Sequence, residues 1–304
     1  MESLCGRDVL SMADLSQSEI LYLLDFSSQM KSGAMTPRCP KVLGLLFQKA
    51  STRTRVSFSV AMYQLGGNVI DLNPQSTQVG RGEPLPDTAR VLDRYLDALA
   101  IRTFAQADLE TIANHARIPV INALTDREHP CQVLADLLTL KESFGGLEDL
   151  TLTYVGDGNN MAHSLLLGCA LVGVNIRIAA PVGYQPLPEI VSQAEGIAAG
   201  KSEVVITTDV KAAAAGSHAL YTDVWASMGQ EDEAADRLPL FQPYQINDEL
   251  LQLANPNAIV LHCLPAHRGE EITPAVLEGP QSRVWEEAEN RLHAQKALLA
   301  SILA

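Results

Sequence analysis

Continuous runs of Val, Ile and Leu alternate along this chain with segments whose apolar residues recur at helical spacing. The runs are apolar at successive positions, which is typical of strands buried on both faces of a parallel sheet. Parallel neighbours need crossover connections, and the intervening helical segments supply them. We therefore expect strands at residues 41–47, 68–72, 98–103, 118–123, 152–156, 176–180, 204–207, 220–224 and 258–263.

The alternation falls into two series. A long helix begins near Pro130 and ends at Gly145-Gly146, after which the pattern restarts. A chain of 304 residues is long enough for two hydrophobic cores. We expect two doubly wound α/β domains with a cleft between them, residues 1–145 and 146–285, and a last helix, 286–304, that packs back on the first. Because ligands bind at the carboxyl ends of such strands, a shared ligand would occupy the cleft.

The charge balance narrows the possible partners. Lys and Arg total 22 and Asp and Glu total 36, so the formal net charge is −14. A surface this acidic repels nucleic acid and anionic lipid. The longest apolar run, residues 165–174, is about half the length of a bilayer span. The first residues contain no apolar signal segment, and the five cysteines are widely spaced without a CxxC pair. We expect a cytoplasmic protein with free thiols.

Residues 51–55, STRTR, follow an expected strand and open a helix. Helix N-termini present free N–H groups and a positive dipole end, so two hydroxyls and two guanidiniums there suggest a phosphate cradle. The segment contains no glycine and is not a Walker loop. Arg53 and Arg55 point in nearly opposite directions, so we expect one of them to serve structure. The alternative is a capped helix with surface arginines.

Two further segments could hold an anion in the first domain. Arg102 ends an expected strand, where it is either an anion clamp or an ordinary rim residue. His129 and Gln132 lie three residues apart at the start of the helix that Pro130 opens, so they share one face. They either contact one ligand together or form a capping pair.

The second domain offers three segments. Residues 156–160, GDGNN, imitate a dinucleotide fingerprint, but the third glycine and the later acid are missing, so we expect Asn160 to face a small polar ligand rather than NAD. In residues 223–229, DVWASMG, Asp223 could pair with a cationic amine and the following turn with a carboxylate. Cys263, in HCLP, is either packing or a substrate contact. The spacing of His262, Cys263 and His267 lacks a full zinc set, so no metal is expected. Arg291 by itself suggests a solvated helix charge.

Taken in order, these segments strongly resemble the ornithine carbamoyltransferases. The resemblance rests on STRTR, an arginine at a strand end, HPxQ, GDGNN, DVWxSMGQE, HCLP and EAENR, and it runs from about residue 40 to the C-terminus. The first motifs are shared by carbamoyltransferases in general, whereas DxxxSMG with HCLP resembles the ornithine branch. The segment before STRTR departs from many relatives, which carry an acid before Lys49 and a proline in place of Ala50.

The resemblance implies an activity and an assembly. The expected reaction transfers the carbamoyl group of carbamoyl phosphate to the side-chain amine of L-ornithine, giving L-citrulline and phosphate in arginine biosynthesis. No cofactor is implied, because carbamoyl phosphate is already activated. Homotrimers, or multiples of trimers, with active sites at subunit boundaries are implied. Residues 1–145 with 286–304 would bind carbamoyl phosphate, and residues 146–285 would bind ornithine.

The resemblance also assigns residues to each substrate. Those implied to bind carbamoyl phosphate are Ser51, Thr52, Arg53, Thr54, Gln78, Arg102, His129, Gln132 and Arg291, with Gln78 reaching into the neighbouring subunit's site. Those implied to bind ornithine are Asn160, Asp223, Ser227, Met228, Cys263 and Leu264. Catalytic roles are implied for Arg53, Arg102, His129 and Cys263, and a cis peptide bond for Leu264-Pro265.

Two alternatives to this interpretation remain. The first is a carbamoyltransferase for another amine, such as putrescine or acetylornithine, or for aspartate, because specificity rests on a few contacts. The second is a non-catalytic oligomer that only binds a small anion. A protein of the second kind would not need the cradle arginines or HCLP, and this chain has both.

Overall fold

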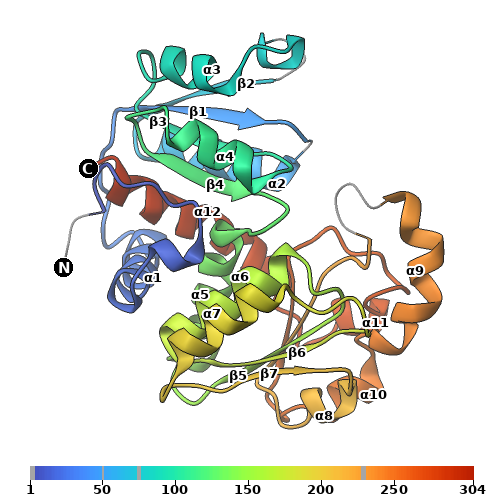
Figure 1. The fold of residues 1–304 in the computed structure, drawn as a ribbon. Coiled ribbons are helices and arrows are strands. Elements are labelled where there is room, and N and C mark those ends of the chain that lie inside the picture. Colours follow the sequence, from blue (N-terminus) through green and yellow to red (C-terminus); the bar gives the residue numbers. More distant parts are fainter. Residues whose placement is uncertain (1–3, 50, 74–76, 227–230) are drawn as a thin grey trace. The chain divides into compact units, whose positions relative to one another are not determined.

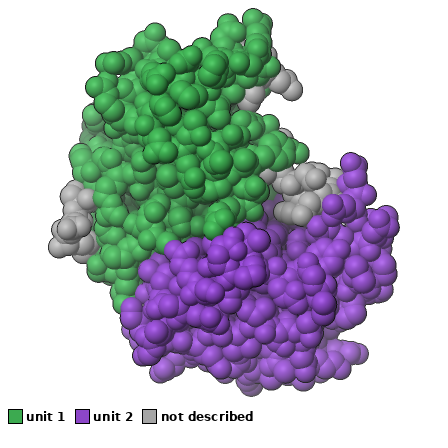
Figure 2. Space-filling view, in the orientation of Figure 1, with its two compact units in different colours: residues 1–135, 290–304 green, residues 136–289 purple. Residues whose placement is uncertain are grey.

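The computed structural model describes residues 4–49, 51–73, 77–226 and 231–304. The chain forms two compact units, unit 1 with residues Met1–Ala135 and Asn290–Ala304, and unit 2 with residues Asp136–Glu289 (Figure 2). The chain passes between them inside two helices, α5 (Pro130–Phe144) and α12 (Val284–Ile302). The sequence pattern places the first division at Gly145-Gly146, where α5 ends, but the division by contacts falls within the helix.

Unit 1 is built on a parallel sheet with the strand order β2-β1-β3-β4 (Figure 1). Its strands are β1 (Val42–Phe47), β2 (Asn68–Leu72), β3 (Ala98–Arg102) and β4 (Val120–Leu124). The chain runs from β1 outward to β2 and then returns to the other side of β1 for β3, so the winding direction reverses between β1 and β3. Phe47 at the end of β1 pairs with Arg102 at the end of β3, which brings both carboxyl ends to one level.

The first helix of unit 1 begins at a local capping signal in the sequence. The Ser16 hydroxyl accepts from the Glu19 amide, and the Glu19 carboxylate accepts from the Ser16 amide at 2.8 Å, so a capping box starts the first helix. The helices are α1 (Gln17–Lys31), α2 (Thr52–Gln64), α3 (Leu85–Leu92) and α4 (Gln106–Ala113), with 3-10 helices Met12–Asp14 and Val79–Arg81. The C-terminal residues of α12 belong to this unit as well.

Unit 2 contains a second parallel sheet, ordered β7-β6-β5-β8-β9. Its winding reverses between β5 and β8, so the loops after these two strands leave the sheet in opposite directions. Figure 1 shows α6 and α7 on one face of the sheet and α8 and α10 on the other. The strands are β5 (Thr151–Val155), β6 (Asn175–Ala179), β7 (Val204–Thr207), β8 (Ala219–Thr222) and β9 (Ile259–His262).

Three short helices of unit 2 are absent from the sequence-based expectation. They are α9 (Ala234–Phe241), which contains Pro239, and the four-residue helices α10 (Asp248–Leu251) and α11 (Pro274–Leu277). An internal proline or a single turn leaves too little periodicity to detect. The remaining helices are α6 (Asn160–Val172), α7 (Pro188–Ala198) and α8 (Val210–Ala214), with 3-10 helices Glu231–Glu233 and Gln242–Tyr244.

All nine expected strands are present, and all pair in parallel, so the prediction of two doubly wound parallel-sheet domains is confirmed. The core of each sheet consists of aliphatic strand residues, such as Leu43 and Leu45 in unit 1 and Leu220 and Val260 in unit 2, all fully buried. Among the described residues, every helix is too short or too polar to cross a bilayer.

Gly158, in the loop after β5, provides a stability test. A Cβ atom at this position would lie 2.2 Å from Pro186 N and 2.4 Å from Gln185 C, both backbone atoms that cannot swing aside. We expect Gly158→Ala to lower the free energy of unfolding by about 2 kcal/mol. Gly196, exposed in α7, is the matched control, because a Cβ atom there would have no neighbour within 4 Å. Gly196→Ala should raise the free energy of unfolding by about 0.5–1 kcal/mol. Urea unfolding measures both, and a Gly158→Ala protein as stable as wild type would contradict the packing.

Candidate active site

The first cluster of polar residues lies in unit 1, where β1 leads into α2. Ser51 is the N-cap residue of α2 in an extended conformation, yet within the described structure its side chain makes no capping hydrogen bond. Its hydroxyl instead lies 3.5 Å from Arg102 Nη1, at the end of the neighbouring strand β3. The open end of a helix beside a guanidinium is a favourable place for an anion.

The two arginines of STRTR have different surroundings. The Arg55 guanidinium pairs with Asp71 of β2 and lies 5.1 Å from the centre of the Phe47 ring. Arg53 is exposed, and its charge acts on His129, across the unit 1 cluster. The expectation that one of the two serves structure is confirmed, and that one is Arg55.

Arg291 of α12 is buried, with 3% of its surface exposed. Its guanidinium donates to Gln132 Oε1 of α5 and, at 3.1 Å, to Thr54 Oγ1 of α2. The interpretation of Arg291 as a solvated helix charge is therefore wrong, because the helix turns this residue toward two polar groups that are themselves buried. A charge held by neutral acceptors in the interior remains available to an anionic ligand.

His129 is also buried, at the start of α5. Burial lowers the pKa of its imidazole well below the usual 6.5, and the nearby charges of Arg291, Arg102 and Arg53 lower it further. The ring is therefore neutral at physiological pH, with one N–H to donate. A neutral donor among three guanidiniums suits the binding and polarisation of a phosphate ester or anhydride.

Most of the residues expected to bind an anion thus meet in unit 1. No hydrogen bond or ion pair found among the described residues joins Gln78 to this cluster. Gln78 is exposed at the start of the 3-10 helix Val79–Arg81. The residues that share contacts or charge effects here are Ser51, Arg53, Thr54, Arg102, His129, Gln132 and Arg291.

A second cluster lies in unit 2, at the carboxyl ends of β5 and β8. Asn159 caps α6 by accepting from the amides of Met161 and Ala162, and its Nδ2 donates to Asp223 Oδ2 at 3.0 Å. Asn160, the first residue of α6, is buried beside it. Sequence reasoning selected Asn160 and missed Asn159, although an asparagine before a helix is a recognisable capping signal.

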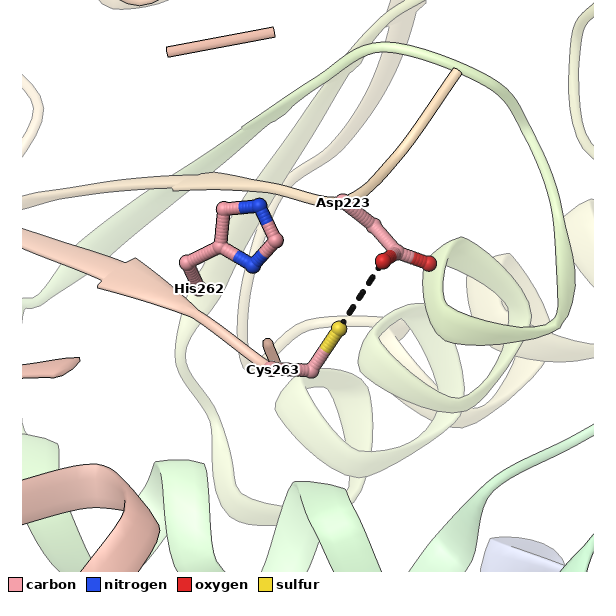
Figure 3. A group of neighbouring side chains, drawn as sticks. All are labelled: Asp223, His262 and Cys263. Carbon is pink, nitrogen blue, oxygen red and sulfur yellow. Dashed lines mark hydrogen bonds between the residues drawn. The ribbon is translucent and has the colours of Figure 1, made fainter. Parts of the chain in front are cut away.

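Cys263 and Asp223 are in direct contact (Figure 3). The thiol donates to Asp223 Oδ1 at 3.0 Å. Burial raises the pKa of the Cys263 thiol well above 9.0, and the negative charges of Asp223, Glu287 and Asp136 raise it further. The thiol is therefore protonated at neutral pH, and it shares the Asp223 carboxylate with Asn159 and with the Val224 amide.

His262 fixes the backbone after β9. Its Nδ1 accepts from the Leu264 amide at 2.9 Å, so its ring proton is on Nε2, which donates to Glu271 at 3.0 Å. Leu264 has a φ of 57°, and the Leu264-Pro265 bond is cis, as expected. A leucine in the left-handed region needs support from its surroundings, and His262 supplies it. Glu271, nine residues downstream across a loop, gave no signal in the sequence.

Two groups of side chains have the residue types of a metal site. One contains Asp223, His262 and Cys263, and the other contains His267, Glu270 and Glu271. In the first group the thiol is protonated and both imidazole nitrogens already have partners, so a metal would have to displace these bonds. Among the described residues, the His267 side chain falls in the second group, and His262 and Cys263 fall in the first.

Arg237 of α9 was not anticipated from the sequence. It pairs at 2.9 Å with Asp157, from the GDGNN segment, and donates to the Trp225 carbonyl oxygen. Burial raises the pKa of Asp157 to about 6 despite this partner, which acts in the opposite direction. The pair links the loops that follow β5 and β8. Ser227 and Met228, also expected to bind ligand, lie outside the described residues.

Family models match nearly the whole chain. The carbamoyl-P binding domain of aspartate/ornithine carbamoyltransferases matches residues 7–142, and their Asp/Orn binding domain matches residues 148–302. Ornithine carbamoyltransferases from Thermosynechococcus vestitus and Nostoc punctiforme are 76% and 73% identical over 303 residues, covering 100% of this chain and 98% and 99% of theirs. This chain belongs to the ornithine carbamoyltransferase family.

Solved ornithine carbamoyltransferases have the same fold. The enzyme from Gloeobacter violaceus superposes with a TM-score of 0.91 at 58% identity, over 99% of both chains. The enzyme from Pyrococcus furiosus gives 0.95 at 46% identity, over 100% of this chain and 99% of that one. The resemblance inferred from the motifs is confirmed at the level of the family.

The raised pKa of Cys263 can be tested by alkylation. At about pH 8 we expect iodoacetamide to modify the Cys263 thiol slowly, because the thiolate is the reactive form. Asp223→Asn removes the neighbouring charge and should lower the pKa of the thiol, and the alkylation rate should rise about tenfold if that pKa falls by about one. Peptide mass spectrometry measures the rate at Cys263 alone. Asp248→Asn, on the exposed α10, serves as control, and equal rates in wild type and Asp223→Asn would refute the electrostatic coupling.

Proposed function

We propose that this chain transfers the carbamoyl group of carbamoyl phosphate to the side-chain amine of L-ornithine, giving L-citrulline and phosphate. The observation that carries the proposal is the buried Arg291, hydrogen-bonded to Gln132 and Thr54 beside a neutral His129. This arrangement suits an anion with a polarisable carbonyl group. The ornithine carbamoyltransferases that are 76% and 73% identical to the chain support the same substrates.

Carbamoyl phosphate binds to the unit 1 cluster in this proposal. Ser51, Thr52, Arg53 and Thr54 hold the phosphate at the N-terminus of α2, where helix N–H groups and a guanidinium favour a dianion. Arg102, His129, Gln132 and Arg291 also contact carbamoyl phosphate, with His129 and Gln132 near its carbamoyl end. The match of residues 7–142 to a carbamoyl-P binding domain supports this assignment.

Ornithine binds to the unit 2 cluster. The residues assigned to ornithine in the described structure are Asn160, Asp223, Cys263 and Leu264. Ser227 and Met228 are assigned as well, and the family motif alone supports these two. The match of residues 148–302 to an Asp/Orn binding domain supports the assignment. A carboxylate at Asp223 orients a cationic amino acid, and the Asn159 and Cys263 hydrogen bonds fix that carboxylate.

The nucleophile must be a neutral amine. With a reference pKa of about 10.4, about one amine in 2,500 is neutral at pH 7, a cost of roughly 4.6 kcal/mol. A nearby anion favours the ammonium form, so Asp223 serves binding and orientation rather than deprotonation. Cys263, hydrogen-bonded to Asp223, lines the path of the departing proton, and we assign it a part in the proton relay.

Attack on the carbonyl carbon places negative charge on the carbamoyl oxygen. The donors assigned to that oxygen are the His129 imidazole, Arg102 and the Thr54 hydroxyl. One such donor is typically worth about 3 kcal/mol in the transition state. Because His129 is neutral, it stabilises the oxygen by donating a hydrogen bond and does not transfer a full proton. Arg53 stabilises the departing phosphate.

The proposal includes an assembly and a cellular setting. We propose homotrimers, or multiples of trimers, in the cytoplasm, active in arginine biosynthesis. The exposure of Gln78 supports a role for this residue in the site of a neighbouring subunit.

The choice of amine decides between the proposal and its closest alternative. Purified protein should form a ureido product from carbamoyl phosphate with L-ornithine at a kcat/KM at least about a hundredfold above that with putrescine, N-acetylornithine or aspartate, because a missing carboxylate or a missing cation leaves buried polar groups unpaired. A colorimetric citrulline assay with each amine in turn measures this. A higher kcat/KM with another amine would make that amine the substrate in place of ornithine. No product with any amine would favour an anion-binding protein without activity.

Arg53 and Arg55 form a matched pair for the phosphate cradle. Arg53→Ala should reduce kcat/KM for carbamoyl phosphate at least about a hundredfold, because a charge-assisted contact to the dianion is lost. Arg55→Ala should cost less than about threefold, because Arg55 pairs with Asp71 instead. Steady-state kinetics with circular dichroism to check folding compares them. A near-wild-type rate for Arg53→Ala would remove the cradle from the mechanism.

A further inference from the structure

Two buried carboxyl groups have no part in the proposed chemistry. Asp136 lies on α5 and Glu287 on α12, both within unit 2, and neither is exposed to solvent. A side-chain hydrogen bond joins them. Two carboxyl groups can form such a bond only when one of them carries a proton, because an ionised carboxylate has no donor.

Glu287 connects this pair to the strands that end at the second cluster. Its Oε2 accepts from the His262 amide at 2.8 Å, at the last residue of β9 before Cys263. Its Oε1 accepts from the Tyr221 hydroxyl at 3.2 Å, on β8 two residues before Asp223. One side chain of α12 thereby holds the ends of both strands that supply the Cys263–Asp223 contact.

We propose that Asp136 and Glu287 share a single proton at neutral pH and together act as positioning residues, fixing the ends of β8 and β9 so that Cys263 and Asp223 keep their contact. The inference rests on the proposed function for its effect on turnover, but the protonation of the pair is independent of it. The pair contributes one negative charge, not two, to the surroundings of Cys263.

Burial and the neighbouring negative charge both favour a pair that carries one proton over a pair with two ionised carboxylates. Burial raises the pKa of Glu287 well above its usual 4.5, and the adjacent Asp136 raises it further. The titratable side chains on which charge from the pair acts are Tyr221 from β8, Cys263 after β9, and Cys169 from α6. The pKa values of Tyr221 and Cys263 are both raised, in part by the charge of the pair.

The pair also has a regular place on its helices. Gln132 lies four residues before Asp136 on α5, and Arg291 lies four residues after Glu287 on α12. Residues four apart share a face of a helix. One face of α5 therefore carries Gln132 and Asp136, and one face of α12 carries Arg291 and Glu287. Gln132 bonds to Arg291 in unit 1, and Asp136 bonds to Glu287 in unit 2.

Amide substitutions distinguish an Asp136–Glu287 pair that shares one proton from a pair in which both carboxylates are ionised. In Glu287→Gln or Asp136→Asn, an amide N–H takes the place of the shared proton. The remaining carboxylate is then ionised, so the net charge of the pair stays at −1, as in wild type. The double variant removes that charge. With one shared proton, alkylation of Cys263 should proceed at the wild-type rate in each single variant and faster in the double variant, by about tenfold if the pKa of the thiol falls by about one. Faster alkylation in either single variant would show two ionised carboxylates and overturn the proposal.

Infrared difference spectroscopy detects the proton directly. The spectrum of wild type minus Glu287→Gln at neutral pH should contain the carbonyl band of a protonated carboxylic acid. Glu19→Gln is the matched control, because Glu19 is buried but its pKa is lowered, so its removal should subtract only carboxylate bands. A difference spectrum for Glu287→Gln that contains carboxylate bands alone would overturn the shared proton.

Stability provides a second readout of the same proton. A raised pKa means that the contribution of Glu287 to stability is present below about pH 4.5 and is lost as the pH rises toward its folded pKa. Glutamine does not titrate, so urea unfolding should show Glu287→Gln gaining stability relative to wild type as the pH rises from about 5 to 8. A difference between the two proteins that does not change with pH would contradict the proposal.

Kinetics test the positioning role. Glu287→Ala leaves the His262 amide without its acceptor, so kcat for citrulline formation should fall at least about tenfold at unchanged KM for carbamoyl phosphate. Glu287→Gln should remain within about threefold of wild type. A wild-type kcat in Glu287→Ala, or loss of activity in Glu287→Gln with its fold intact, would overturn the role.

Wild-type protein that forms no citrulline would instead refute the proposed function, while the alkylation and infrared results would still decide the protonation.

Discussion

The reversal of strand order in each parallel sheet places the polar residues of this protein. Between β1 and β3 in unit 1, and between β5 and β8 in unit 2, the chain leaves neighbouring strands in opposite directions, so backbone polar groups and side chains converge at the carboxyl ends. Ser51 and Arg102 meet at the first reversal, and Asn159 and Asp223 meet at the second. A parallel sheet with no reversal would spread the same residues along an edge.

The two units stabilise buried charge in opposite ways. Unit 1 gathers cations, and its histidine remains neutral because burial and the neighbouring arginines both lower its pKa. Unit 2 gathers acids, and its thiol and one of its buried carboxyls remain protonated because burial and neighbouring anions raise their pKa values. Each cluster therefore keeps the charge that suits one substrate, an anion in the first and a cationic amino acid in the second.

The sequence predicts the strands, the long helices and most of the polar clusters, because these depend on local periodicity and on motifs at strand ends. It fails where a side chain's partner is distant along the chain. Arg291 has the sequence context of a surface charge, although α12 buries it against residues more than 150 positions away. Glu271, Arg237 and Asp136 gave no signal, because charge alone does not reveal that a position is buried.

These distant partners explain why the site can be rigid although its motifs lie on loops. Leu264 adopts a conformation that leucine rarely takes, and the bonds that hold it pass from its amide to His262 and from there to Glu271. The His262 amide is in turn held by Glu287, a helix residue, so the loop after β9 is anchored from two sides. In the resting protein at neutral pH, His129 is therefore neutral, the Cys263 thiol is protonated and the Asp136–Glu287 pair keeps one proton.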